Sequence, residues 1–108
     1  MKELTRKEEL IMLSILGLRS DAYLVAITDH LSRILGHTIM LTSVHLPLTR
    51  LEKMGFIASE FGESTAVRGG RRKKVYRITK AGLRALGEHK RINDALWAAY
   101  PRFSKQGN

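Results

Sequence analysis

Residues 68–79 carry most of the information about the fold, and they read Arg68-Gly69-Gly70-Arg71-Arg72-Lys73-Lys74-Val75-Tyr76-Arg77-Ile78-Thr79. Gly69 and Gly70 can adopt positive φ without steric cost, so the chain can turn tightly at this point. The residues after the basic run favour β structure and alternate between two faces, which is the pattern of a short strand. The stretch therefore predicts the tip and the returning strand of a β-hairpin. Its like charges repel one another, a cost that contact with a polyanion such as DNA or RNA would offset.

Positive charge is concentrated in the same part of the chain. The 108 residues have a formal net charge of +9 and a pI near 10.4. Residues 66–91 contain ten Lys and Arg against one acid, whereas residues 1–65 contain seven Lys and Arg against eight acids. A chain of this length suits one domain with a modest core. The uneven charge favours a nucleic-acid surface, and the alternative is a basic face that is merely solvated.

Several classes of protein are disfavoured by what the sequence lacks. Without cysteine, the chain forms neither disulfides nor thiolate metal sites. No apolar run approaches the roughly 20 residues of a membrane span, and the first residues lack a signal-peptide pattern, so we expect a cytoplasmic protein. The four histidines lack metal-ligand spacing, and no phosphate-loop or nucleophile motif is present. We therefore expect no metal, no cofactor and no catalytic residue.

Two helices are predicted in the first third of the chain. Thr5 and Glu8 form a Thr-x-x-Glu capping box that begins the first helix, which we expect to be buried on most sides. Ser20 or Asp21 is predicted to cap the second helix, in which apolar residues recur every three or four positions. Gly36 is a suitable residue to end it.

A third helix and a hairpin are predicted next. Thr42 or Ser43 is expected to cap the third helix and Gly55 to end it, while Pro47 should make its start irregular. Residues 56–61 are predicted to form a strand, residues 62–70 a loop, and the segment from Arg71 or Arg72 to Thr79 the returning strand. Thr79 then caps a last helix that ends near Pro101.

This order of elements predicts a mainly α (α+β) winged helix-turn-helix. It comprises a three-helix core, a two-stranded β-hairpin wing and a C-terminal dimerisation helix. We assign residues 1–80 to the DNA-binding domain, residues 81–101 to the dimerisation helix and residues 102–108 to a disordered tail. The third helix is the candidate for the major groove of DNA, and the hairpin tip for the adjacent backbone or minor groove.

The sequence resembles the PadR family of bacterial transcriptional regulators over residues 4–90. The resemblance is carried by residues 21–27, Val44-His45 and residues 48–57, and most specifically by residues 68–83. It implies a homodimer whose C-terminal helices pack together, operator binding by paired recognition helices, and repression that a ligand or another signal relieves. His45 and Pro47 depart from the residues usual in the family, so the resemblance implies no base preference.

The predicted DNA-binding residues fall into two groups. Short hydroxyl side chains near a helix N-terminus suit phosphate, while His45, Thr49 and Arg50 can reach base edges. Basic wing residues suit phosphate, and Lys73 is the first that we would leave out, because alternation sends some side chains to the far face. The set is Thr42, Ser43, His45, Thr49, Arg50, Arg68, Arg71, Arg72 and Lys74. The alternatives are simple capping for Thr42 and Ser43, and a surface ion pair with Glu52 or Glu60 for Arg50.

The last helix predicts a homodimer, because alone it would expose a sizeable apolar patch. The predicted interface residues are Leu86, Ile92, Leu96, Trp97 and Tyr100, with the first helix contributing. A small-molecule effector is left open, in a cavity with Tyr23 and Trp97 as lining candidates.

The sequence therefore predicts a sequence-specific, double-stranded DNA-binding regulator that acts as a dimeric repressor. Two alternatives stay open: a winged-helix module that binds another protein, and an RNA-binding protein. The RNA alternative rests on the high pI alone, since the sequence offers no set of exposed aromatic side chains for stacking bases.

Overall fold

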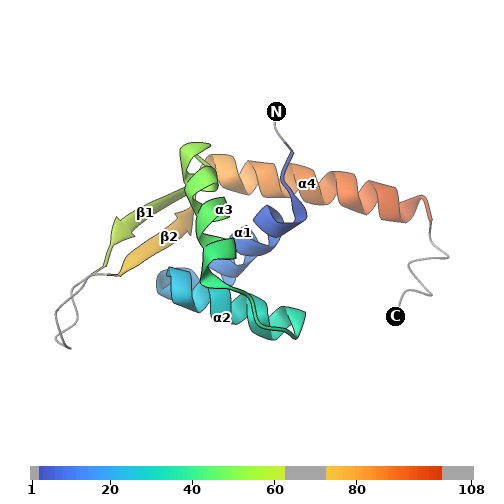
Figure 1. The fold of residues 1–108 in the computed structure, drawn as a ribbon. Coiled ribbons are helices and arrows are strands. Elements are labelled where there is room, and N and C mark those ends of the chain that lie inside the picture. The colour runs from blue at the N-terminus through green and yellow to red at the C-terminus, as the bar shows by residue number, and fades with distance from the viewer. Residues whose placement is uncertain (1–2, 63–72, 101–108) are drawn as a thin grey trace.

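The computed structural model describes residues 3–62 and 73–100, in which a helical core carries a β-hairpin on one side and a long last helix on top (Figure 1). The elements are α1 (Arg6–Leu18), a 3₁₀ turn η1 (Arg19–Asp21), α2 (Leu24–Leu35), α3 (Leu41–Lys53), β1 (Ile57–Phe61), β2 (Lys74–Ile78) and α4 (Lys80–Ala98). This order confirms the predicted α+β winged helix-turn-helix. The tail that was predicted to be disordered lies outside the described residues.

The hydrophobic core lies where α1, α2 and α3 meet the start of the hairpin. Its fully buried side chains include Ile11 and Met12 of α1, Ile27 of α2, and Leu48 and Leu51 of α3. Burial of this kind contributes roughly 25 cal/mol per Å² of apolar surface and holds the three helices in one arrangement. The core thereby sets the direction in which α3 presents its outer face.

Helix α1 begins with the predicted capping box. The backbone N–H of Thr5 donates to Oε1 of Glu8 at 2.8 Å, and the backbone N–H of Glu8 donates to Oγ1 of Thr5 at 3.1 Å. As predicted, the helix is buried or half-buried on most sides, but Leu13 and Leu16 on the remaining side are exposed. One face of α1 is therefore left without a covering element in the described chain.

The predicted cap of α2 was wrong. Residues Ser20 and Asp21 lie in η1, and α2 begins after Tyr23, whose side chain makes no capping hydrogen bond. The cause is tertiary: the backbone N–H of Tyr76 in β2 donates to the carbonyl of Ala22 at 2.8 Å, and Tyr23 bridges to Val75. These contacts hold residues 22–23 in non-helical conformations and so delay the helix. At the other end, Gly36 has φ +78 and closes α2, as predicted.

Helix α3 also begins earlier than predicted. Its N-cap is Met40, without a side-chain capping bond, so Thr42 and Ser43 lie inside the first turn. The hydroxyl of Ser43 instead donates to the carbonyl of Met40 at 2.8 Å. Pro47 does not interrupt the helix, and its ring is buried against the core. Helix α3 is therefore one continuous element that can present a single outer face.

The hairpin is antiparallel, as predicted, with Ile57 opposite Ile78 and Phe61 opposite Lys74. Tyr76 is buried, whereas its neighbour Arg77 is exposed, so the expected alternation of faces is present. The described strands are shorter than predicted, and the basic tip between them lies outside the described residues.

Helix α4 begins at the predicted cap, Thr79, whose Oγ1 accepts from the backbone N–H of Gly82 at 3.0 Å. A Cβ atom at Gly82 would lie only 2.0 Å from the backbone oxygen of Phe56. The absence of a side chain there lets α4 pack directly against the chain that leads into β1. Beyond Leu86, which still packs in the core, α4 extends away from it (Figure 1).

The described ranges lack two features that mark other classes of protein. Among residues 3–62 and 73–100, no helix has the length and apolar character that a bilayer crossing requires. The same ranges contain no group of three or more His, Asp or Glu side chains placed to hold a metal ion.

Candidate nucleic-acid interface

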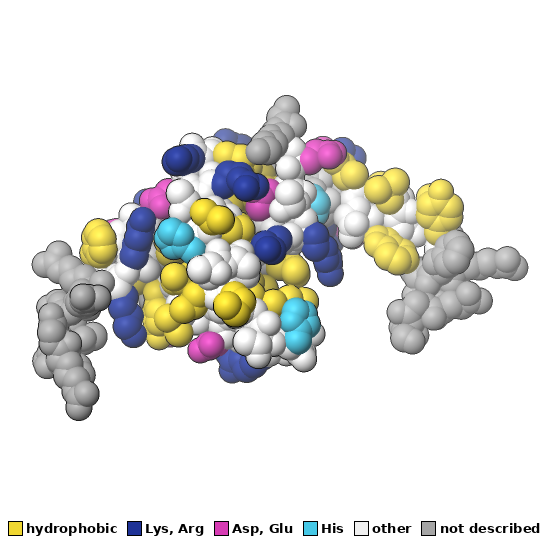
Figure 2. Space-filling model, viewed as in Figure 1, with side chains coloured by type: hydrophobic (Ala, Val, Ile, Leu, Met, Phe, Trp, Pro, Cys, Tyr) yellow, Lys and Arg dark blue, Asp and Glu magenta, His cyan; other side chains and the backbone are white. Residues whose placement is uncertain are grey.

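The outer face of α3 is polar and accessible over most of its length. Thr42, His45, Thr49 and Arg50 are exposed, and Ser43 is half-buried, so the structure brings these five predicted residues to one helix. Lys and Arg side chains surround hydrophobic ones over α3 on the face shown in Figure 2. A helix with exposed hydroxyl, imidazole and guanidinium groups can hydrogen-bond base edges in a major groove.

Some donors on this face are already used within the chain. The hydroxyl of Thr49 donates to the carbonyl of His45 at 3.1 Å, and the hydroxyl of Ser43 donates to the carbonyl of Met40. Their oxygens keep lone pairs that can accept a hydrogen bond. As donors to phosphate or bases, Ser43 and Thr49 are therefore weaker candidates than their exposure suggests.

Arg50 has an acidic partner, but neither of the two expected from the sequence. Its Nη1 lies 3.6 Å from Oε2 of Glu8, a carboxylate of α1 that is only 1% exposed. This oxygen has no hydrogen-bond partner among the described residues. The guanidinium itself remains half exposed, so Arg50 lies between a buried anion and the surface where DNA would bind.

One residue of this face was missed by sequence reasoning. Leu46 is 68% exposed although it lies in the middle of α3, four residues after Thr42 and three before Thr49. These spacings place the three side chains on one stripe of a helix. The spacing alone indicates this position, but a leucine lacks the hydrogen-bonding groups by which the other candidate residues of this face are recognised.

The wing is fastened to α3 by Glu52. Oε2 of Glu52 accepts from the hydroxyl of Ser59 in β1 at 2.5 Å, and Oε1 lies 3.5 Å from Nζ of Lys74 in β2. Lys74 also lies over the ring of Tyr76, 5.7 Å from its centroid. Burial raises the pKa of the Tyr76 phenol, an effect that the charge of Lys74 opposes. Lys74, a predicted DNA contact, therefore also interacts with Glu52 and Tyr76 of its own chain.

The other basic wing residues are only partly described. Lys73 lies 4.1 Å from the centroid of the Tyr23 ring, a cation–π contact that directs it back to the protein, in keeping with its place outside the predicted set. The predictions for Arg68, Arg71 and Arg72 lie outside the described residues.

The far half of α4 exposes apolar side chains, seen in Figure 2 beyond the core. Ile92, Leu96, Trp97 and Tyr100 all belong to this exposed set. Leu86 does not: it is 8% exposed and packs in the core of its own chain. Leu86 therefore has little surface left for a partner, and the predicted interface has to be redrawn without it.

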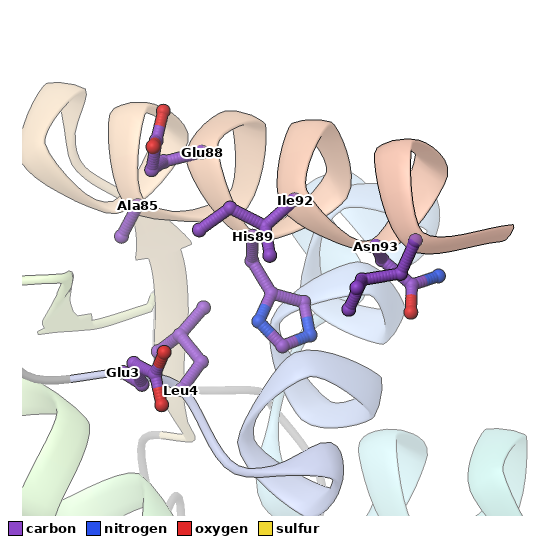
Figure 3. Close-up of a pocket in the computed structure, with 8 residues that line it drawn as sticks. Glu3, Leu4, Ala85, Glu88, His89, Ile92 and Asn93 are labelled. Atoms are coloured by element: carbon purple, nitrogen blue, oxygen red, sulfur yellow. The ribbon is translucent and has the colours of Figure 1, made fainter. Parts of the chain in front are cut away.

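A hollow of ≈ 360 Å³ lies beneath α4 (Figure 3). Leu4 enters it from the N-terminal segment, and His89 and Ile92 enter it from α4. Nε2 of His89 lies 3.4 Å from Oε1 of Glu9 on α1. Tyr23 and Trp97, the residues considered for an effector cavity, lie at opposite ends of the molecule, since Tyr23 pairs with β2 and Trp97 is in the last turn of α4 (Figure 1). One chain alone does not bring them together.

The arrangement of α2, α3 and hairpin agrees with a known family. Residues 12–88 match the family described as the Transcriptional regulator PadR-like family. The chain belongs to this family. As a PadR-like protein it is a transcriptional regulator and not an enzyme, as the sequence predicted.

Solved structures agree with this assignment. The chain is similar to a PadR family transcriptional regulator from Eggerthella lenta, with 31% identity over 91% of this chain and 83% of that one, at a TM-score of 0.68. A transcriptional regulator from Clostridium thermocellum is 23% identical, with coverage of 90% and 88% and a TM-score of 0.70. A PadR family transcription regulator from Clostridium difficile is 24% identical, with coverage of 89% and 96% and a TM-score of 0.68. The last two show the fold. No curated protein matches the chain.

Proposed function

We propose that this PadR-like chain is a dimeric repressor that binds a specific, palindromic duplex DNA in the cytoplasm. The observation that supports this most is the accessible face of α3, with His45, Thr49 and Arg50, beside a wing strand that carries Lys74. A groove-reading helix next to a cationic hairpin is the arrangement of winged DNA-binding domains. The repressor role is what the resemblance to the family implies.

In this proposal the two elements have different tasks. Helix α3 enters the major groove, where His45, Thr49 and Arg50 meet base edges and Thr42 and Ser43 lie nearest the phosphates. The wing follows the adjacent backbone through its basic residues, which in the sequence are Arg68, Arg71, Arg72 and Lys74. Phosphate contacts then supply affinity, and α3 supplies the choice of sequence.

The division of the chain follows from these tasks. Residues 1–80 form the DNA-binding part, and residues 81–101 form the helix through which two copies join. The exposed apolar residues of α4 support this, because surfaces of that kind mark contact with a partner. Leu13 and Leu16 of α1 are exposed as well and would contribute. A symmetric pair would place its recognition helices about one DNA turn, roughly 34 Å, apart.

The salt dependence of duplex binding tests the role of the wing. An operator duplex is first selected from a random pool, and its affinity is then measured across a salt series. Each phosphate contact adds about 0.9 to the slope of log affinity against log salt. Replacing Arg71 and Arg72 by alanine removes up to four contacts per dimer, so we expect the slope to fall by up to about 3.6. The matched control is Lys90→Ala with Arg91→Ala, which removes the same charge from α4 and should leave the slope nearly unchanged.

The same titration separates the alternatives. If the chain is a module that binds another protein, no duplex should be selected, and the wing variant should leave partner binding intact. If it is an RNA-binding protein, single-stranded RNA of matched length should bind more tightly than any duplex. Affinity for duplex that ignores both its sequence and the salt concentration would contradict the proposal.

A further inference from the structure

Leu46 is the one large apolar side chain among the exposed residues of α3 between Thr42 and Arg50. It is 68% exposed, and its neighbours along the stripe are Thr42 and Thr49. Figure 2 shows hydrophobic side chains over α3 amid Lys and Arg. Its position, rather than its exposure alone, makes it informative, because isolated exposed leucines are common on protein surfaces.

The fold of the chain does not require Leu46. The core side of α3 is formed by Val44, Leu48 and Leu51, which are at most 1% exposed, and Leu46 points away from them. Its exposed side chain adds little buried area, and so contributes little to folding. A function for this leucine has to come from what α3 meets outside the chain.

The chemistry of base edges limits what Leu46 can recognise. A leucine side chain neither donates nor accepts hydrogen bonds, and the apolar group that the major groove offers is the C5-methyl of thymine. The nearby hydroxyls of Ser43 and Thr49 already donate to the backbone carbonyls of Met40 and His45. Fewer polar donors in this turn of α3 are therefore left to recognise bases, and an apolar contact contributes a larger share of that recognition.

We propose that Leu46 is a specificity-determining residue that selects a thymine in each half-site of the operator by packing against its C5-methyl group. This inference rests on the proposed function, because it requires α3 to enter a major groove. It adds the identity of one base at the position that faces the centre of α3.

The experiment removes only the methyl group. In a duplex selected by the wild-type chain from a random pool, each thymine of one half-site is replaced in turn by deoxyuridine, and affinity is measured at fixed salt. We expect one position to weaken wild-type binding about fourfold, and about fifteenfold when both half-sites are changed. For Leu46→Ala, replacing the same thymine by deoxyuridine should change affinity by less than about 1.5-fold, since the leucine side chain that contacts the methyl group is absent.

A matched control separates this contact from general loss of apolar surface. Ile34 at the end of α2 is about as exposed as Leu46 but lies outside α3, so Ile34→Ala should keep the full sensitivity to deoxyuridine. Circular dichroism of each variant confirms folding. If the wild-type chain binds its selected duplex but tolerates every deoxyuridine, or if Leu46→Ala stays equally sensitive, the role of Leu46 is refuted while the proposed function stands. If no duplex is selected at all, both are refuted.

Discussion

At the scale of single residues, Arg50 lies between two anionic partners, the buried Glu8 and the proposed DNA. It belongs to the helix proposed to read DNA, yet its guanidinium lies 3.6 Å from Oε2 of the buried Glu8. A carboxylate removed from water needs a counter-charge or hydrogen bonds, and Oε2 has no hydrogen bond among the described residues. Arg50 therefore stabilises the junction of α1 and α3, in addition to its proposed role in binding DNA.

Replacing Arg50 by alanine should lower both stability and affinity for the operator. Because Arg50 is half exposed, solvent screens the pair, and we expect a loss of about 1–2 kcal/mol in unfolding free energy. In a Glu8→Gln background the same replacement should cost clearly less, since the buried charge is gone. Thermal unfolding at fixed chain concentration measures both. An unchanged midpoint for Arg50→Ala would mean that Arg50 serves DNA binding only.

At the scale of elements, the junction between α4 and the hairpin depends on one glycine. Gly82 lies in the first turn of α4, and its backbone lies against Phe56. A methyl group there would meet the carbonyl oxygen of Phe56 at 2.0 Å, so backbone would have to move.

Gly82→Ala should therefore destabilise the protein by about 1–3 kcal/mol, in spite of the better helix propensity of alanine. Gly87→Ala is the matched control on the same helix, since a Cβ there meets nothing within 4 Å. It should stabilise by up to about 1 kcal/mol. Denaturant unfolding of the two variants gives the comparison. Equal effects of the two substitutions would show that α4 does not pack as closely on the hairpin as described.

Elements whose ends are set by local contacts could be predicted from the sequence. The Thr5–Glu8 box and the Thr79 cap involve residues three apart, so the sequence shows both partners together. The starts of α2 and α3 could not be predicted in this way. Residues 22–23 are held out of the helix by β2, and the chain before α3 is held by Ser32, whose Oγ accepts from the N–H of Ile39. Such partners are distant in sequence.

The candidate site shows the same limit. The polar residues of α3 could be found from the sequence because their side chains can hydrogen-bond to DNA. Leu46 was missed because only its position on α3, and not its chemistry, indicates a role. Leu86 was placed in the dimer interface as one of the apolar residues of the last helix, together with Ile92 and Leu96. Periodicity shows which face of α4 is apolar, but only the structure shows where the chain's own core ends along that face.

At the scale of the whole molecule, the exposed half of α4 is the feature that the fold of one chain leaves unexplained. Leu96 and Trp97 are both more than half exposed, and they lie beyond the elements that could cover them (Figure 1). A second copy would bury these side chains and fix the distance between two recognition helices. The proposed function depends on this pairing, because one domain alone offers only one set of base contacts.

The number of chains on one operator duplex tests this claim most directly. Sedimentation at micromolar concentration should show a dimer that binds a palindromic duplex at two chains per duplex. Leu96→Asp with Trp97→Asp should leave each chain folded but monomeric, with affinity for the palindrome lowered by at least about a hundredfold. Leu83→Asp is the control for charge on the helix: it adds one carboxylate at an exposed leucine near the start of α4 and should leave the dimer intact. A wild-type chain that stays monomeric and binds a palindrome and a single half-site equally well would contradict the account.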